Sequence, residues 1–119
     1  MLININYHIW FKVCKSVKFR YRMSTNDLLI LNGCYLLHLT TNKPFTLNKI
    51  YSFVTYYNKP KIQAYIKRLI ERKFIIQSVN HKGYPLYNIS PLGLQVIEDL
   101  NNSYDVEMGK FCSLYGISL

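Results

Sequence analysis

The basic side chains that could bind a ligand are concentrated between Asn58 and Lys82. This stretch holds seven lysines and arginines and one acid, Glu71, whereas residues 83–119 hold one base and four acids. The whole chain has a formal net charge of +9. Ammonium and guanidinium groups clustered in this way bind polyanions, and nucleic acid suits such a polarised chain better than a membrane surface does. The plainer alternative is a lysine-rich face that contacts only solvent, and it accounts less well for the clustering.

Residues 58–73 have the spacing of a helix with one apolar and one polar face. The apolar residues fall on one side of that helix: Ile62, Ile66, Leu69 and Ile70. The opposite side carries groups that can reach bases or phosphates: Lys61, Gln63, Ala64, Lys67 and Arg68. Asn58 can cap the first turn, and Pro60 falls where its missing N–H costs nothing. These signals define where the helix begins.

The apolar period changes from 3.6 to 2 after Lys73. Residues 74–79 and 84–89 are predicted to be two short strands, and a turn containing His81, Lys82 and Gly83 joins them. A polar-faced helix followed by a basic hairpin is typical of a recognition helix and its wing. Such a helix enters the major groove of DNA, and the hairpin reaches the neighbouring backbone.

The first segment, residues 3–22, fits two templates. Its β-branched and aromatic residues favour a strand or hairpin, while the lack of a turn residue between Ile9 and Met23 favours one helix. We favour the helix and leave the hairpin open. Ser24 and Asp27 then form a capping box before an apolar run to Leu39. A helix that is apolar nearly all round must be covered on several sides, so we expect a central helix between the reading lobe and a partner surface.

A second short helix is predicted from Leu47 to about Tyr57, with Thr46 as its cap. Its expected buried stripe consists of Leu47, Ile50, Phe53 and Val54. Residues 55–58 would be the turn of a helix-turn-helix.

Ser90 and Pro91 predict the start of a C-terminal helix, and Gly109 indicates a break within it. Apolar residues recur along this helix over about five turns. We expect them, together with Trp10 of the first segment, to cover a second copy in a two-fold dimer. The predicted dimerisation residues are Trp10, Ile97, Leu100, Tyr104, Met108 and Phe111. The alternative is that the stripe packs on the chain's own central helix.

The three cysteines, Cys14, Cys34 and Cys112, include no Cys-x-x-Cys pair, so neither a disulfide framework nor a zinc site is expected. Cys34 and Cys112 lie in apolar runs that favour buried thiols. The first residues lack a signal-peptide pattern, and no run is apolar enough to span a membrane. We therefore expect a cytoplasmic protein without a metal ion.

No nucleophile–base pair, paired carboxylates or glycine-rich phosphate loop is present, so we do not expect an enzyme or a cofactor. His38 fits a surface histidine better than a metal ligand. Trp10, Tyr35 and Tyr104 could line an effector pocket, but filling the core is the simpler role. Whether the chain binds a small-molecule effector stays open.

The chain resembles winged-helix transcription regulators of the MarR and PadR type. The resemblance covers roughly residues 23–100. Residues 61–76 resemble that family's recognition helix and its exit, with Phe74 where glycine is usual, and residues 81–93 resemble a PadR-style wing leading into the next helix. The Asp-x-Arg pair of the MarR wing is absent. The resemblance implies an intracellular dimer that binds a near-palindromic DNA duplex.

We therefore predict an α+β, mostly α, fold: a winged helix-turn-helix with a two-stranded β-wing and flanking N- and C-terminal helices. One domain would span residues 1–119, with residues 1–23 and 91–119 as dimerisation elements. Its recognition helix would be about residues 59–73 and its wing residues 75–89. The expected function is sequence-specific binding of double-stranded DNA by a homodimeric regulator. The rival reading is a winged-helix module that binds protein and has no specific DNA site.

The side chains expected to face the groove are Lys59, Lys61, Gln63, Ala64 and Lys67. Gln63 suits an adenine edge, and lysines suit guanine or phosphate. Those expected to contact mainly phosphates are Arg68, Arg72, His81 and Lys82. Such contacts fix the register of the protein on DNA without reading sequence.

Overall fold

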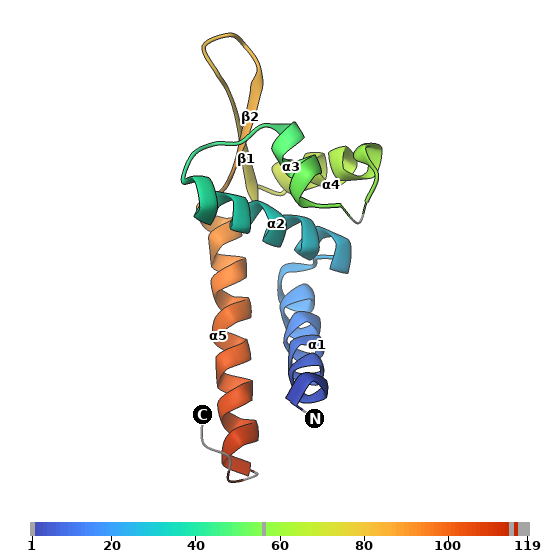
Figure 1. The fold of residues 1–119 in the computed structure, drawn as a ribbon, viewed down its shortest axis with the longest axis vertical. Coiled ribbons are helices and arrows are strands. Elements are labelled where there is room, and N and C mark those ends of the chain that lie inside the picture. The colour runs from blue at the N-terminus through green and yellow to red at the C-terminus, as the bar shows by residue number, and fades with distance from the viewer. Residues whose placement is uncertain (1, 56, 115, 117–119) are drawn as a thin grey trace. The chain divides into compact units, whose positions relative to one another are not determined.

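The computed structural model describes residues 2–55, 57–114 and 116, with side chains from His8 onward (Figure 1). Those residues group into two compact units. One unit consists of residues 24–95, and the other combines residues up to 23 with those from 96 onward. The elements in chain order are α1 (Leu2–Tyr21), α2 (Thr25–Thr41), α3 (Leu47–Phe53), α4 (Lys59–Glu71), β1 (Ile75–Val79), β2 (Pro85–Ile89) and α5 (Pro91–Leu114).

Helix α2 is the centre of the 24–95 unit. The predicted capping box is present: the Asp27 N–H donates to Ser24 Oγ, and the Ser24 N–H donates to the Asp27 carboxylate, both at 3.1 Å. Asn42, in the left-handed conformation, ends the helix. Buried apolar side chains on α2 pack against α3, α4 and β2. Leu29, Leu36 and Leu39 are exposed, so the partner surface expected for this helix stays a prediction.

Helix α3 begins where Thr46 was predicted to cap it, but it ends at Phe53 and not near Tyr57. Ile50 and Val54 are buried as expected, whereas Phe53 is 46% exposed, so its place in the buried stripe was wrong. The reason is that Val54 leaves the helix with extended backbone and points inward. Its methyl group would lie only 2.7 Å from a Cβ at Gly33, so α2 needs glycine there.

Helix α4 has the predicted cap and core face. Asn58 Oδ1 accepts the Lys61 N–H at 3.0 Å, Pro60 sits in the first turn, and Ile62, Ile66 and Leu69 are buried. The chain leaves α4 through Lys73 at a φ of 68°, after which Phe74 is buried.

The hairpin is also as predicted. β1 and β2 pair antiparallel with Ile75 opposite Ile89, and Gly83 takes a φ of 84° in the connecting turn. Asn80 Oδ1 accepts two backbone N–H groups of that turn. On the edge of β2 that does not face β1, Phe45 and Tyr87 exchange two backbone hydrogen bonds of 2.8 Å. The hairpin extends away from the helices of its own unit (Figure 1).

Helix α5 starts at Pro91, where Ser90 Oγ accepts the Gly93 N–H at 3.0 Å and donates to the Lys73 carbonyl at 2.6 Å. The start is as predicted. The break expected at Gly109 was wrong, because α5 continues through it to Leu114. A glycine lowers helix propensity by only about 1 kcal/mol, which the surrounding turns can offset.

The first segment is one helix, α1, and not a hairpin. The Trp10 ring stacks on Tyr104 of α5 with centroids 4.2 Å apart, and Lys12 pairs with Glu107 at 3.0 Å. Arg20 lies 3.4 Å from the carboxylate of Asp99. Thus α1 of the same chain covers part of the α5 stripe, a partner that the sequence did not identify. None of the helices among the described residues is long and apolar enough to cross a membrane.

The predicted dimerisation residues fall into two groups. Ile97 and Leu100 are buried within one copy, and Trp10 and Tyr104 contact each other. Met108 and Phe111 are half-buried. Other apolar side chains of α1 and α5 stay exposed: Phe11, Phe19, Val106 and Leu114. The role of the predicted set in a dimer stays a prediction.

Candidate nucleic-acid interface

The exposed face of α4 gathers the side chains that the sequence singled out for groove contact. Its buried face is fixed by Ile62, Ile66 and Leu69, so the helix can present only the opposite side. All the predicted groove residues are exposed on α4: Lys59, Lys61, Gln63, Ala64 and Lys67. The face therefore combines ammonium groups with one amide that can donate and accept hydrogen bonds.

The wing carries a second exposed cationic group. His81 and Lys82 lie in the turn between β1 and β2, and both are exposed. Arg72, at the end of α4, is half-buried with its guanidinium carbon 5.2 Å from the centre of the Phe74 ring. Helix α4 and the wing belong to the same compact unit, so one unit presents both.

A hollow of about 490 Å³ lies between α3, α4 and the wing strands. Gln63 and Lys67 line it together with two polar residues that the sequence analysis did not select, Glu71 and Gln77. Its apolar lining comes from Leu47, Ile66, Ile70 and Tyr87. Because of this hollow, one flank of α4 is open toward the wing. The polar side chains of α4 on that flank are accessible to a ligand.

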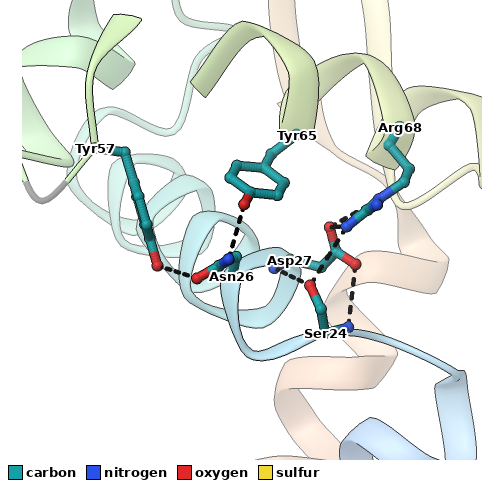
Figure 2. A network of polar contacts seen from close by, with 6 residues as sticks. All are labelled: Ser24, Asn26, Asp27, Tyr57, Tyr65 and Arg68. Atoms are coloured by element: carbon teal, nitrogen blue, oxygen red, sulfur yellow. Dashed lines mark hydrogen bonds and ion pairs between the residues drawn. The ribbon is translucent and has the colours of Figure 1, made fainter. Parts of the chain in front are cut away.

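The other flank of α4 is closed by a polar network with the first turn of α2 (Figure 2). Arg68 donates from Nε and Nη2 to the same oxygen of Asp27, at 3.1 and 2.7 Å, and Nη2 lies 3.4 Å from Ser24 Oγ. The Arg68 side chain is 48% exposed, while that of Asp27 is 3% exposed. Arg68 was predicted to contact phosphate. Its guanidinium is engaged by a buried carboxylate, and the phosphate contact stays a prediction.

Asn26 extends this network to two tyrosines. Its amide Nδ2 donates to Tyr65 Oη at 2.7 Å, and the Tyr57 hydroxyl donates to its Oδ1. The two tyrosine rings meet edge to face with centroids 5.7 Å apart. In Figure 2 the Asn26 side chain lies between the two hydroxyl groups. Sequence reasoning missed Asn26, Tyr57 and Tyr65, because only their contacts across the fold reveal them.

The titration of Asp27 reflects this environment. Burial by itself raises the pKa of the carboxyl, but the hydrogen bonds from Arg68 and Ser24 outweigh burial, and the pKa lies below its ordinary value. Asp27 is therefore charged at neutral pH, and the ion pair with Arg68 is formed.

The remaining candidate groups are two cysteines and His38. Cys34 is buried, and burial raises the pKa of its thiol to about 12, so it is a protonated core residue. Cys112 is also buried, as predicted. His38 Nδ1 lies 3.1 Å from Asn88 Oδ1. Among the residues that the structure describes, no group of three His, Cys, Asp or Glu side chains could hold a metal ion.

Known proteins resemble this chain in structure but not in sequence. No family model and no curated protein matches the sequence. Solved structures do match: the MepR–DNA complex from S. aureus has a TM-score of 0.76 and 15% identity, covering 95% of this chain and 82% of that chain. The transcriptional regulator Tm0710 from Thermotoga maritima has a TM-score of 0.74 and 15% identity, covering 94% and 75%. This chain has a winged helix-turn-helix fold of the MarR type.

The elements of the 24–95 unit correspond to the parts of a winged helix-turn-helix. Helices α3 and α4 are the helix-turn-helix, α4 is its second helix, and β1 and β2 are the wing. The fold class expected from the sequence is confirmed. A variant of MepR has also been solved bound to an oligodeoxyribonucleotide, with a TM-score of 0.77 and 14% identity, covering 94% of this chain and 80% of that chain.

Proposed function

We propose that this chain is a sequence-specific, double-stranded DNA-binding transcription regulator that acts as a homodimer. One observation carries the proposal: a winged-helix unit presents lysines and Gln63 on the exposed face of α4, and His81 and Lys82 in the turn of its wing. Two structural neighbours of the same fold are solved with DNA, which supports this use of the fold. A protein of this kind works in the compartment that holds the DNA, which in a bacterium is the cytoplasm.

Helix α4 would read base edges and the wing would bind the backbone. Gln63 can pair with both the N6 and N7 groups of adenine, whereas lysines serve guanine or phosphate. Lys82 and His81 would contact phosphates beside the groove and fix the register. Arg72 would add a phosphate contact at the end of α4.

The dimer would be formed by α1 and α5. Phe11 and Phe19 are exposed eight residues apart on α1, and Val106 and Leu114 have the same spacing on α5. Residues eight apart lie on one side of a helix, and the residue midway between each pair is an exposed lysine, Lys15 on α1 and Lys110 on α5. Each helix therefore keeps two exposed apolar side chains that flank a lysine. A second copy would cover these apolar side chains, and two recognition helices would then bind two half-sites.

The first experiment measures binding to random duplex DNA at about 50 and 200 mM salt, with the native mass determined in parallel. We expect binding that weakens by orders of magnitude over that range, because phosphate contacts release counterions. A dimeric mass would complete the expected result, and an operator would then be selected from a random pool.

Absence of binding even at the lower salt would contradict the proposal. In that case the cationic face of α4 would be assigned to an acidic protein partner, as in the rival interaction module.

A further inference from the structure

Two adjacent residues in the first turn of α2 hold the recognition helix from one side. Asp27 binds Arg68 of α4, and Asn26 binds Tyr65 of α4 and Tyr57 in the turn before it (Figure 2). We call these five side chains the α2–α4 lock. They join α2 to the middle of α4, to its last turns and to the turn that leads into it.

The apolar side of α4 sets which face is buried, but by itself it does not fix the exact rotation of the helix about its axis. Ile62, Ile66 and Leu69 are held by hydrophobic burial, which has no preferred direction. Hydrogen bonds depend on direction, and those to a charged group are the strongest. Asp27 Oδ1 accepts two guanidinium N–H groups of Arg68, and its Oδ2 accepts the Ser24 N–H, so the buried carboxylate has partners at both oxygens.

Asn26 adds a second fixed point one turn earlier on α4. Its oxygen and its nitrogen each have one tyrosine hydroxyl as partner, so the amide is used at both ends. The Arg68 guanidinium also lies 5.5 Å from the centre of the Tyr65 ring, which links the two halves of the lock.

We propose that Asn26 and Asp27 are positioning residues for sequence reading, and that Arg68 anchors α4 to α2 and does not serve as a phosphate contact. The lock fixes the rotation of α4, and thereby the direction in which Gln63 and Lys67 point. This inference rests on the proposed function, because it concerns how the reading face is aimed.

The inference is tested with the purified full chain, its selected operator and a random duplex. The variants are Asp27→Asn, Arg68→Gln, the double variant and Tyr65→Phe. Each change in the ion pair should weaken operator binding about tenfold or more, and the double variant should be no weaker than the worse single variant, since both act on one interaction. Random-duplex affinity should change less than about twofold, because phosphate contacts remain.

Two further variants separate positioning from folding. Asp27→Glu keeps the charge and the capping box, so operator affinity should return to within about threefold of wild type. Asp105→Asn makes the same chemical change at an exposed position on α5 and should leave binding unaltered. Tyr65→Phe removes one hydroxyl and no charge, so it should fold and still lose operator affinity about threefold to tenfold.

The salt dependence decides the role of Arg68. If Arg68 anchors α4, Arg68→Gln should leave the slope of log affinity against log salt unchanged. If Arg68 contacts a phosphate, the same variant should have a slope smaller by about one. A reduced slope would overturn the assignment. Equal losses on operator and random duplex in Tyr65→Phe would also overturn it.

Amide hydrogen exchange gives a readout that needs no DNA. Exchange within α4 should quicken in Asp27→Asn and Tyr65→Phe and stay at the wild-type rate in Asp105→Asn. If the wild-type protein binds no duplex, the proposed function is wrong. If the wild-type protein binds its operator and the lock variants bind it equally well, only this inference is wrong.

Discussion

At the scale of single residues, the cations of α4 have different surroundings. Lys61 and Lys67 are exposed, whereas Arg68 is paired with a buried carboxylate. An exposed ammonium group can approach a phosphate at little desolvation cost, while releasing Arg68 would leave Asp27 buried without its partner. Residues of one charge on one helix are therefore not equivalent binding groups.

Gln63 and Lys82 should differ in what their loss does to DNA binding. Gln63→Ala should relax the preference at one base position by about 1–3 kcal/mol, because a paired amide discriminates between bases. Lys82→Ala should weaken binding to operator and to random duplex alike, with a salt slope smaller by about one. Competition binding with single-base operator variants measures both. Equal base preference in wild type and Gln63→Ala would exclude Gln63 from reading.

The Asp27 carboxylate should make stability depend on acid pH. Its pKa is lowered in the folded state, so its contribution is present above the ordinary carboxyl pKa and is lost as pH falls through the lower folded value. Asp27→Asn should therefore cost about 1–3 kcal/mol of unfolding free energy at pH 7. Urea unfolding at several pH values measures this. The gap between wild type and variant should shrink below about pH 4, and a gap that stays constant there would contradict the assignment.

At the scale of elements, the close approach of chain segments depends on small residues at particular points. A Cβ at Gly93, in the first turn of α5, would lie 2.3 Å from the Phe74 carbonyl oxygen and 2.7 Å from Ile89. Backbone cannot move aside as a flexible side chain can. Gly93 thus sets how near α5 begins to the end of α4 and to the wing strand β2.

Two glycines of α5 provide a matched pair of alanine substitutions. Gly93→Ala should destabilise the fold by about 1–3 kcal/mol, because the added methyl group meets backbone. Gly109→Ala should stabilise it by about 0.5–1 kcal/mol, because nothing lies within 4 Å of the new Cβ and alanine favours a helix. Thermal unfolding of both variants tests the pair. Equal effects would show that the contacts at Gly93 do not limit packing.

At the scale of the whole molecule, the unit formed by α1 and α5 keeps apolar side chains exposed. Phe19 is 88% exposed, the highest value among the large apolar residues of the described chain. Burying such area on association is favourable by about 25 cal/mol per Å² before the costs of ordering. The proposed dimer would use this area.

Phe19→Glu should shift the protein from dimer to monomer, because a carboxylate would have to be buried at the interface. Its own fold should persist, since the side chain is exposed in one copy. Phe53→Glu is the control, an exposed phenylalanine of the other unit whose replacement should leave the mass unchanged. Native mass and sedimentation measure the outcome. A dimeric Phe19→Glu variant would remove this face from the proposed interface.

Local sequence signals determined most of the elements. The caps at Ser24, Thr46 and Asn58 act on amides three residues away, and the periods of 3.6 and 2 report which side of a helix or strand is apolar. Interactions of this range do not depend on the rest of the fold. For that reason the helix starts, the hairpin and the exposed face of α4 could be predicted from the sequence.

Contacts between distant residues were decided only by the tertiary structure. Arg68 and Asp27 are 41 residues apart, and Lys12 and Glu107 are 95 apart, so no pattern within either segment records their pairing. The sequence showed Asp27 as half of a capping box and Arg68 as one more cation. The fold made them one ion pair, because closing the intervening chain brought α4 onto the first turn of α2. It likewise supplied α1 as the cover of α5 and turned Phe53 outward, since packing across the chain selects among faces that local periodicity leaves equivalent.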